Sequence, residues 1–394
     1  MTPKAPYVAR LVALTSALLL ASCAMVPPSF PAGEACLADG FAIEDDFVAA
    51  RRGTCTVLPD DSVSLRIPAE FSGKINPSPW FAFKVIPNGA SQAVIDLTYT
   101  RHSHRYWPKV SSDGLNWNQL DERYVTVADD GKSARVVVPL ESEPVWIAAQ
   151  EIISPAVHDA WNQKMSAAIG ASLSVLGESK AGLPIHIIDT NPGGENILFL
   201  VGRQHPPEVS GAIAFFAFGE IVFGDSELAR EFRDRFRVIA IPMLNPDGIV
   251  GGHWRLNLGG IDLNRDWGPF EQPETALVGE LLDKLDAADA RIRMFVDFHS
   301  TNKNVFYTQF DVTDPPAFTT RWLSAAAPRI SDYPFGKETR PITNYTVAKN
   351  YMFKRYGIPA VTFEVGDETD RSAAKAAARV FAEELMRTML QQEY

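Results

Sequence analysis

The chain has 394 residues, of which 46% are hydrophobic and 22% are charged. This length is enough to bury one large core or two smaller ones, and the composition excludes an intrinsically disordered protein. The formal net charge is −11 and no segment is rich in lysine and arginine, so nucleic acid is not an expected partner.

The first 22 residues have the features of an export signal. Two basic residues precede the apolar run 11–21, which is shorter than the roughly 20 residues that a helix needs to span a bilayer. The run ends in Leu20-Ala21-Ser22-Cys23, which resembles the lipobox of bacterial lipoproteins, in which the cysteine is lipidated and becomes the N-terminus. Ala24 after this cysteine favours the outer membrane. We therefore expect a signal peptide over 1–22 and a lipid-anchored, periplasm-facing protein of the bacterial cell envelope. The alternative is an ordinary secretory signal in which Cys23 is incidental.

Residues 23–40 are rich in proline and predict a tether between the membrane and the folded chain. The remaining cysteines are Cys36 and Cys55. In an oxidising compartment, an isolated pair in a loop-rich segment predicts a disulfide, and two unbonded buried thiols are the alternative. Neither cysteine is an expected catalytic nucleophile.

Short β-like runs fill residues 41–152. They occupy residues 62–67, 80–86, 93–99 and 134–138. Turn signals such as Pro87-Asn88-Gly89 and Asp129-Asp130-Gly131 separate them. This spacing predicts a small antiparallel β-sandwich domain.

From residue 153 to residue 394, apolar runs alternate with helical segments. The runs are 197–201, 238–243, 294–298 and 360–363. They lack a clean alternation of polar and apolar residues, which is typical of strands buried on both faces of a parallel sheet. The expected helices are 210–223, 226–234, 273–288, 317–324 and 372–391. The order predicts an α/β domain with a largely parallel sheet.

Three of these runs lead to histidine or glutamate. The first is followed by His205 and Glu208, the third by His299 and the fourth by Glu364. Open α/β sheets bind ligands at the carboxyl ends of their strands, so we expect these four side chains on one side of the sheet.

Two imidazoles and one carboxylate, with water in the fourth position, form a common catalytic zinc site. A second carboxylate beside that water can serve as its general base. The competing interpretation is local: His205 would be a surface loop residue and Glu208 a favourable carboxylate at a helix N-terminus.

Pro206 and Pro207 separate His205 from Glu208. The fixed φ angles of proline would stiffen this loop and place both ligands before the metal binds. Since both intervening positions are proline, no arginine is available there for substrate binding.

The motifs resemble those of the zinc carboxypeptidase family, the M14-type metallopeptidases, over about residues 154–394. The matching motifs, in the order of the family, are His205-x-x-Glu208, Asn245-Pro246-Asp247-Gly248, Arg255, Asp262-Leu263-Asn264-Arg265-Asp266-Trp267, His299 and Thr362-Phe363-Glu364. The resemblance implies a mixed, mostly parallel sheet flanked by helices behind the β-sandwich.

The resemblance also implies the reacting groups. One Zn²⁺ ion would be held by His205, Glu208 and His299. Glu364 would take a proton from the zinc water and pass it to the leaving amine. Arg255 would polarise the scissile carbonyl and stabilise the developing oxyanion.

By the same resemblance, Asn264 and Arg265 would bind the terminal carboxylate of the substrate, for which the planar guanidinium is suited. Asp262 would hold the second ring nitrogen of His205. The alternative for Arg265 is a structural ion pair with Asp262 or Asp266.

Many family members close a tyrosine of a mobile loop over the substrate. Tyr345 is the nearest candidate upstream of Glu364, although the interval does not match cleanly. The β-sandwich before the catalytic domain resembles the cytosolic-carboxypeptidase-like branch, which includes deglutamylating enzymes. Lys349 falls in the segment that would shape the specificity pocket, close to Arg340 and Asn350, and basic groups there would favour an acidic terminal side chain.

The expected function is therefore a zinc-dependent metallocarboxypeptidase that hydrolyses the C-terminal peptide bond of a peptide. The expected location makes envelope peptides and peptidoglycan stem peptides, which contain acidic residues, plausible substrates. Two alternatives are a zinc-dependent deacylase of N-acyl amino acids and a non-catalytic envelope lipoprotein that binds peptide or glycan. The intact Glu364 argues against the last. The sequence does not indicate whether the protein is a monomer or an oligomer.

Overall fold

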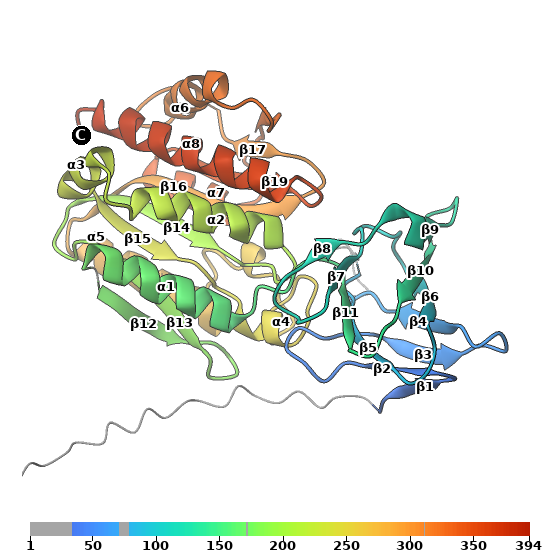
Figure 1. The fold of residues 1–394 in the computed structure, drawn as a ribbon. Helices are drawn as coiled ribbons and strands as arrows, with labels where there is room; N and C mark the ends of the chain where they lie inside the picture. Colours follow the sequence, from blue (N-terminus) through green and yellow to red (C-terminus); the bar gives the residue numbers. More distant parts are fainter. Residues whose placement is uncertain (1–33, 71–78, 171, 311) are drawn as a thin grey trace, which may run out of the picture.

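Figure 1 shows the computed structural model of the chain, which describes residues 34–70, 79–170, 172–310 and 312–394. The expected signal peptide, the lipidation site Cys23 and the tether as far as residue 33 lie outside these residues. The described chain forms an N-terminal β-sandwich and a larger α/β domain, as the sequence predicts.

The β-sandwich consists of a six-stranded and a five-stranded sheet. The first contains, in spatial order, β1 (Cys36–Ala38), β2 (Phe41–Glu44), β5 (Ala82–Pro87), β11 (Val145–Ala148), β7 (Lys109–Ser111) and β8 (Asn118–Gln119). The second contains β3 (Thr54–Val57), β4 (Val63–Ile67), β6 (Gln92–Tyr99), β10 (Ser133–Pro139) and β9 (Val125–Val127), and a short 3-10 helix, η1 (Glu122–Tyr124), precedes β9. Alternate residues of β6 and β10 face the shared core, because successive side chains of a strand point to opposite faces.

Two details of this domain differ from the expectation. The pair β4–β6 is parallel, because the chain between them passes through β5 in the opposite sheet before it returns. Strand β1 lies within the segment expected to be tether, where it pairs with β2. A disulfide joins Cys36 of β1 to Cys55 of β3, with the two Cα atoms 6.2 Å apart.

The α/β domain is built on an eight-stranded mixed sheet. Its spatial order is β12 (Ser172–Glu178), β13 (Pro184–Asp189), β15 (Arg237–Ile241), β14 (Asn196–Gly202), β16 (Arg291–Thr301), β19 (Ala360–Gly366), β17 (Val305–Thr308) and β18 (Gly336–Thr339). The four central strands, β15, β14, β16 and β19, are mutually parallel. The predicted fold class is confirmed.

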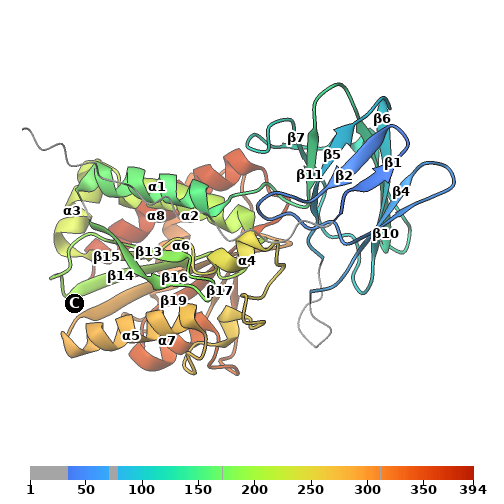
Figure 2. The same cartoon turned by 90° about the horizontal axis from the view of Figure 1, so that it is seen from below.

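Helices cover both faces of this sheet (Figure 2). One face carries α1 (Pro155–Ile169), α2 (Val209–Val222) and α8 (Arg371–Leu390), with α3 (Glu227–Arg235), α6 (Phe318–Ala326) and the 3-10 helix η3 (Ala327–Arg329) beside them. The opposite face carries α5 (Pro273–Ala287) and α7 (Ala348–Tyr356). Two hydrophobic cores, one on each face, explain why the central strands are apolar without alternation.

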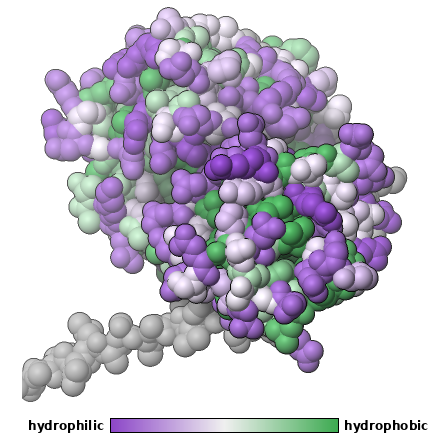
Figure 3. Space-filling model, turned by 45° about the vertical axis from the view of Figure 1, so that its right-hand side comes forward, coloured by the Kyte–Doolittle hydropathy of each residue, from purple (hydrophilic) through white to green (hydrophobic). Residues whose placement is uncertain are grey.

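Among the described residues, no helix by itself has the length and apolarity to cross a membrane. Helices α2 and α3 meet these criteria only as a pair, bent by 88°. Figure 3, in which the β-sandwich is turned forward, shows mostly hydrophilic side chains with separate hydrophobic patches.

Candidate active site

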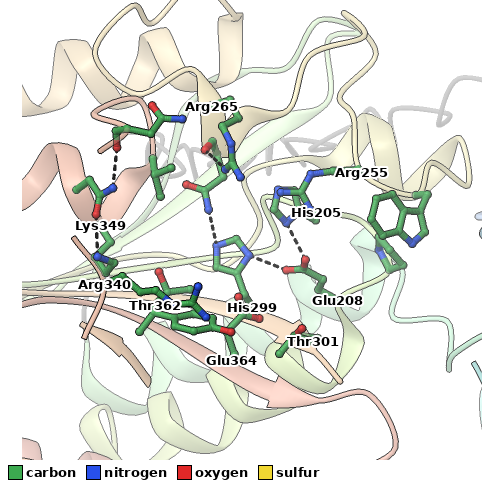
Figure 4. A pocket seen from close by; sticks show the side chains of 18 of the residues that line it. His205, Glu208, Arg255, Arg265, His299, Thr301, Arg340, Lys349, Thr362 and Glu364 are labelled. Atoms are coloured by element: carbon green, nitrogen blue, oxygen red, sulfur yellow. Dashed lines mark hydrogen bonds and ion pairs between the residues drawn. The ribbon is translucent and has the colours of Figure 1, made fainter. Parts of the chain in front are cut away.

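Two buried histidines and a half-buried glutamate form a cluster at the carboxyl ends of the central strands (Figure 4). Glu208 lies between the imidazoles, with one carboxylate oxygen 2.7 Å from Nδ1 of His205 and the other 2.7 Å from Nδ1 of His299. The three potential ligand atoms all lie within 4.8 Å of one another. Two nitrogen donors and one oxygen donor so close together fit a single zinc ion with an open coordination position.

The electrostatics of the cluster also fit a cation. Burial by itself would raise the pKa of Glu208, but the two imidazoles lower it well below its usual value. Glu208 is therefore ionised, as a metal ligand must be.

Local structure holds the ligands together. Glu208 is the N-cap residue of α2, but its side chain caps no backbone N–H and is turned to the imidazoles. Gly211 lets α2 approach β16 closely, since a Cβ atom at this position would lie 2.4 Å from the carbonyl oxygen of His299. The backbone N–H of Gly211 donates to the hydroxyl of Ser300 at 2.8 Å. The glycine thus brings the helix that carries Glu208 against the strand that carries His299.

A carboxylate stands behind each imidazole. Nε2 of His205 lies 2.9 Å from Asp262, and Nε2 of His299 lies 2.8 Å from Asp297. Asp297 is fully buried, and Gln204 donates to both of its oxygens at 2.9 Å. Such carboxylates orient metal-bound histidines and increase their basicity.

The contact of Asp262 agrees with the expectation from the sequence, whereas Asp297 was not among the predicted site residues. The signal was present, because an aspartate inside an apolar strand and two residues before a ligand histidine needs a partner.

His299 and Glu364 lie within strands, not after them as predicted. Strand β16 continues to Thr301 and β19 to Gly366, and the two residues are direct neighbours in the parallel register. Glu364 lines the same cavity as the three potential ligands, and its Oε2 atom is buried without a hydrogen-bond partner among the described residues. Burial raises the pKa of Glu364 to about 7, against the nearby imidazole of His299, which lowers it. This geometry suits a general base.

Arg255 lies beside the cluster, and its Nε donates to Asp262 at 2.6 Å. Asn264 and Arg265 belong to the 3-10 helix η2 (Leu263–Arg265), which Asp262 caps by accepting from the backbone N–H of Asn264. The amide oxygen of Asn264 accepts from the backbone N–H of Ala348 at 2.8 Å. All three predicted substrate-binding residues, Arg255, Asn264 and Arg265, line the cavity.

The ion pair with Asp262 or Asp266, which was the alternative role for Arg265, is at most a long contact in the structure. Its terminal nitrogen is 4.0 Å from Asp262, and 43% of its side chain is exposed. Asp266 instead accepts from the backbone N–H groups of Glu271 and Gln272.

Lys349 lines the cavity near Arg340, and its ammonium donates to the side chain of Asn350 at 2.7 Å. Burial and, to a smaller extent, the charge of Arg340 lower the pKa of Lys349 to about 8. Tyr307 of β17 also lines the cavity under the guanidinium of Arg340, whose carbon lies 4.7 Å from the ring centre. Tyr307 was not among the predicted site residues, because β17 was not predicted as a strand.

Tyr345 does not line this cavity, contrary to the expectation. Its side chain is exposed, and the ammonium of Lys354 lies 3.9 Å above its ring, beside Trp267. The backbone of this loop is held at both sides of the tyrosine, because Asn350 donates to the carbonyl of Asn344 and the carbonyl of Thr346 accepts from Trp267. This anchoring turns Tyr345 to a different surface hollow.

The cavity has a volume of about 450 Å³, within the range typical of ligand pockets. Five cationic side chains line it, namely those of Arg105, Arg255, Arg265, Arg340 and Lys349. Only two carboxylates, Glu208 and Glu364, line it with them. The site is thus basic in a protein whose formal net charge is −11.

Comparison with known proteins places this site in a family. The family model for zinc carboxypeptidases matches residues 159–370, which is more than half of the chain. An uncharacterised protein of Zymomonas mobilis is 26% identical over 73% of this chain and 78% of its own length. Cytosolic carboxypeptidase 1 of Xenopus laevis is 34% identical, but the match covers 28% of this chain and only 9% of that protein.

Solved structures show the same fold. A metallo-carboxypeptidase from Burkholderia cenocepacia has a TM-score of 0.72 and 21% identity, over 89% of this chain and 100% of that chain. A metallo-carboxypeptidase from Pseudomonas aeruginosa, in complex with (2-guanidinoethylmercapto)succinic acid, has a TM-score of 0.70 and 19% identity, over 88% and 98% of the two chains. With the match of the family model to the residues that carry the site, the chain belongs to the zinc carboxypeptidase (M14) family and is a metallocarboxypeptidase.

Proposed function

We propose that this enzyme removes an acidic residue from the C-terminal end of a peptide by hydrolysis. The observation that carries the proposal is Glu364, whose Oε2 atom is buried without a hydrogen-bond partner among the described residues, beside a His–Glu–His cluster in a cavity lined with cations. One zinc ion bound by His205, Glu208 and His299 would supply a water of pKa about 7 and a Lewis acid for the carbonyl.

The chain's own residues divide the remaining work. Glu364 takes the proton of the attacking water and delivers it to the leaving amine. Arg255, which Asp262 holds in place at 2.6 Å, directs its guanidinium at the negative charge that develops on the carbonyl oxygen. Asn264 and Arg265 bind the terminal carboxylate, which limits cleavage to the last residue of the peptide.

The substrate class follows from the charges at one end of the cavity. Lys349 and Arg340 lie on the same side of His299 in Figure 4, away from Glu208 and Arg255. A terminal residue whose carboxylate is held by Asn264 and Arg265 would direct its side chain to this basic end. Carboxylate side chains of aspartate or glutamate would be favoured there, and the excess of cations would attract acidic peptides from solution.

The location is also part of the proposal. The lipobox-like segment ending in Cys23 supports a lipid anchor that holds the enzyme in the bacterial envelope, facing the periplasm. Envelope peptides and peptidoglycan stem peptides with acidic residues would then be within reach. Membrane fractionation of the native protein and of Cys23→Ser tests the anchor. If Cys23 is lipidated, only the native protein should remain in the membrane fraction.

One experiment separates peptidase, deacylase and binding protein. Zinc content and release of terminal residues from a peptide library are measured for the native enzyme and for Glu364→Gln, with N-acyl amino acids as competing substrates. Chelator-sensitive release of acidic residues that depends on Glu364 supports the proposal. Activity on N-acyl amino acids alone would favour the deacylase, which the same zinc ligands and Arg255 would also serve. A zinc-free, inactive native protein would refute an enzymatic function.

A further inference from the structure

The β-sandwich supplies part of the cavity wall. Arg105 and Tyr106 lie in the loop between β6 and β7, and both line the cavity together with residues of the catalytic domain. The Nε and one terminal nitrogen of Arg105 lie 3.0 and 2.9 Å from a single oxygen of Asp367, in the turn between β19 and α8. Only 16% of the Arg105 side chain is exposed. A contact between the domains thus fixes the position of this guanidinium.

Further contacts make this wall rigid. Trp254 of the catalytic domain packs in the hydrophobic core of the β-sandwich, and its indole N–H donates to the hydroxyl of Tyr106 at 3.2 Å. Glu70 of the β-sandwich accepts from the backbone N–H groups of Arg255 and Leu256, at 2.6 and 3.0 Å. The segment that presents Arg255 to the substrate is therefore held by the β-sandwich, and the two domains share one binding surface.

The path of a bound peptide follows from the proposed function, on which this inference rests. The terminal residue occupies the end of the cavity with Asn264, Arg265 and Lys349. The scissile carbonyl lies between Arg255 and the His–Glu–His cluster. The preceding residues must therefore leave past that cluster, away from Lys349.

Arg105 lies on this exit path. Its guanidinium carbon and that of Arg255 each lie 5.7 Å from the centre of the Trp254 ring, so Arg105 is on the Arg255 side of the cavity. Lys349 and Arg340 lie on the opposite side of His299 (Figure 4). Pro207 and Trp254 line the cavity with Arg105. Because both residues between His205 and Glu208 are prolines, the metal-binding loop itself presents no basic side chain to this part of the substrate.

We propose that Arg105 binds the carboxylate of an acidic residue immediately before the scissile bond, so that the enzyme selects peptides that end in two acidic residues. A guanidinium held by Asp367 and shielded from water is preorganised to bind a second carboxylate. Lys349 would select the last residue and Arg105 the one before it, each from a different domain. A charge-assisted hydrogen bond of this kind corresponds to a preference of about ten- to a hundredfold.

The test uses two blocked peptides that differ by one isosteric change and end in Glu-Glu or Gln-Glu. The full-length enzyme should show a kcat/KM at least about tenfold higher for the first peptide. Arg105→Gln should reduce this ratio to near one. Arg101→Gln, an exposed charge change in the same loop that does not touch the cavity, is the matched control and should keep the native ratio.

Arg105→Gln also removes the ion-pair partner of Asp367. The double variant Arg105→Gln/Asp367→Asn removes that carboxylate charge as well, and it should show the same ratio as the single variant. An unchanged ratio in Arg105→Gln overturns the inference. If Arg105→Gln does not fold, the native enzyme decides, since equal rates on the two peptides also overturn it. A native enzyme that releases no terminal glutamate from either peptide in a chelator-sensitive manner contradicts the proposed function instead.

Discussion

The metal-binding cluster and the substrate-binding walls of the cavity are built in different ways. His299 and Glu364 are neighbours on two buried parallel strands, and Glu208 is pressed towards them by the close contact of α2 with β16 at Gly211. The walls combine a helix, loops and the second domain, which contribute Lys349, Arg340 and Arg105.

The metal-binding cluster and the walls of the cavity therefore differ in the substitutions that they tolerate. A shift of one central strand would disturb both hydrophobic cores, so the reacting groups are fixed by the packing of the whole domain. Loop and interdomain residues can be replaced without disturbing the sheet. We therefore expect substitutions in the cluster to remove metal binding or turnover, and substitutions in the walls to change only the choice of substrate.

The largest effect is expected for Glu364→Gln. Removal of a general base lowers kcat by about 10² to 10⁴-fold, while the amide retains the volume of the carboxylate. Zinc content, measured on the purified variant, should remain that of the native enzyme. Residual activity above a tenth of the native value would mean that another group accepts the proton.

Asp297→Asn should weaken metal binding without removing a ligand. Carboxylates behind metal-bound histidines typically contribute about 10 to 100-fold to metal affinity. Competition with a fluorescent chelator should therefore give a zinc Kd higher by that factor. The same measurement on Asp96→Asn, whose carboxylate pairs with Arg135 on the surface of the β-sandwich, is the control and should give the native Kd.

Gly211→Ala should lower both the stability of the fold and the affinity for zinc. The added Cβ atom would lie 2.4 Å from the carbonyl oxygen of His299, so α2 and β16 must separate. Overpacking of this kind costs about 1 to 3 kcal/mol, measured as a lower free energy of unfolding in urea. Gly357→Ala at the end of α7 is a useful comparison, since its added Cβ would meet no atom within 4 Å and any loss there reflects the positive φ alone. Weaker zinc binding should accompany the loss in Gly211→Ala but not in Gly357→Ala.

The smallest effect is a change of selectivity with pH. Burial lowers the pKa of Lys349 to about 8, so the ammonium is charged below this pH and neutral above it. The preference for a terminal glutamate over glutamine should therefore be largest near pH 7 and decline as the pH rises to 9. Lys349→Arg keeps its charge over this range and should keep the preference. A decline of equal size in Lys349→Arg would exclude Lys349 as its origin.

The sequence predicted those parts of the fold whose pattern depends on local burial. The central strands form apolar runs because both of their faces are covered, and their order brought the histidines and glutamates together. Helix α1 was not predicted, since it buries the polar residues His158 and Asn162 and has no clear apolar face. Strands β12 and β13 lie at one edge of the sheet, where burial gives a weaker pattern.

The remaining parts of the site depend on tertiary contacts that a single sequence does not contain. Arg105 is 100 residues before His205 along the chain and reaches the cavity only because the two domains pack together. The side chain of Tyr345 points elsewhere because Asn350 and Trp267 hold the backbone of its loop. Proximity in sequence could not distinguish Tyr345 from Tyr307, which does line the cavity.

We propose that this zinc carboxypeptidase selects acidic C-termini. This selectivity can be measured by incubating the zinc-loaded native enzyme with a peptide that ends in several glutamates and following the mass of the peptide over time. We expect stepwise loss of single glutamate residues from the C-terminus, which stops when a chelator is added. A zinc-loaded enzyme that leaves this peptide intact while it shortens a peptide with an apolar terminus would exclude selectivity for acidic C-termini.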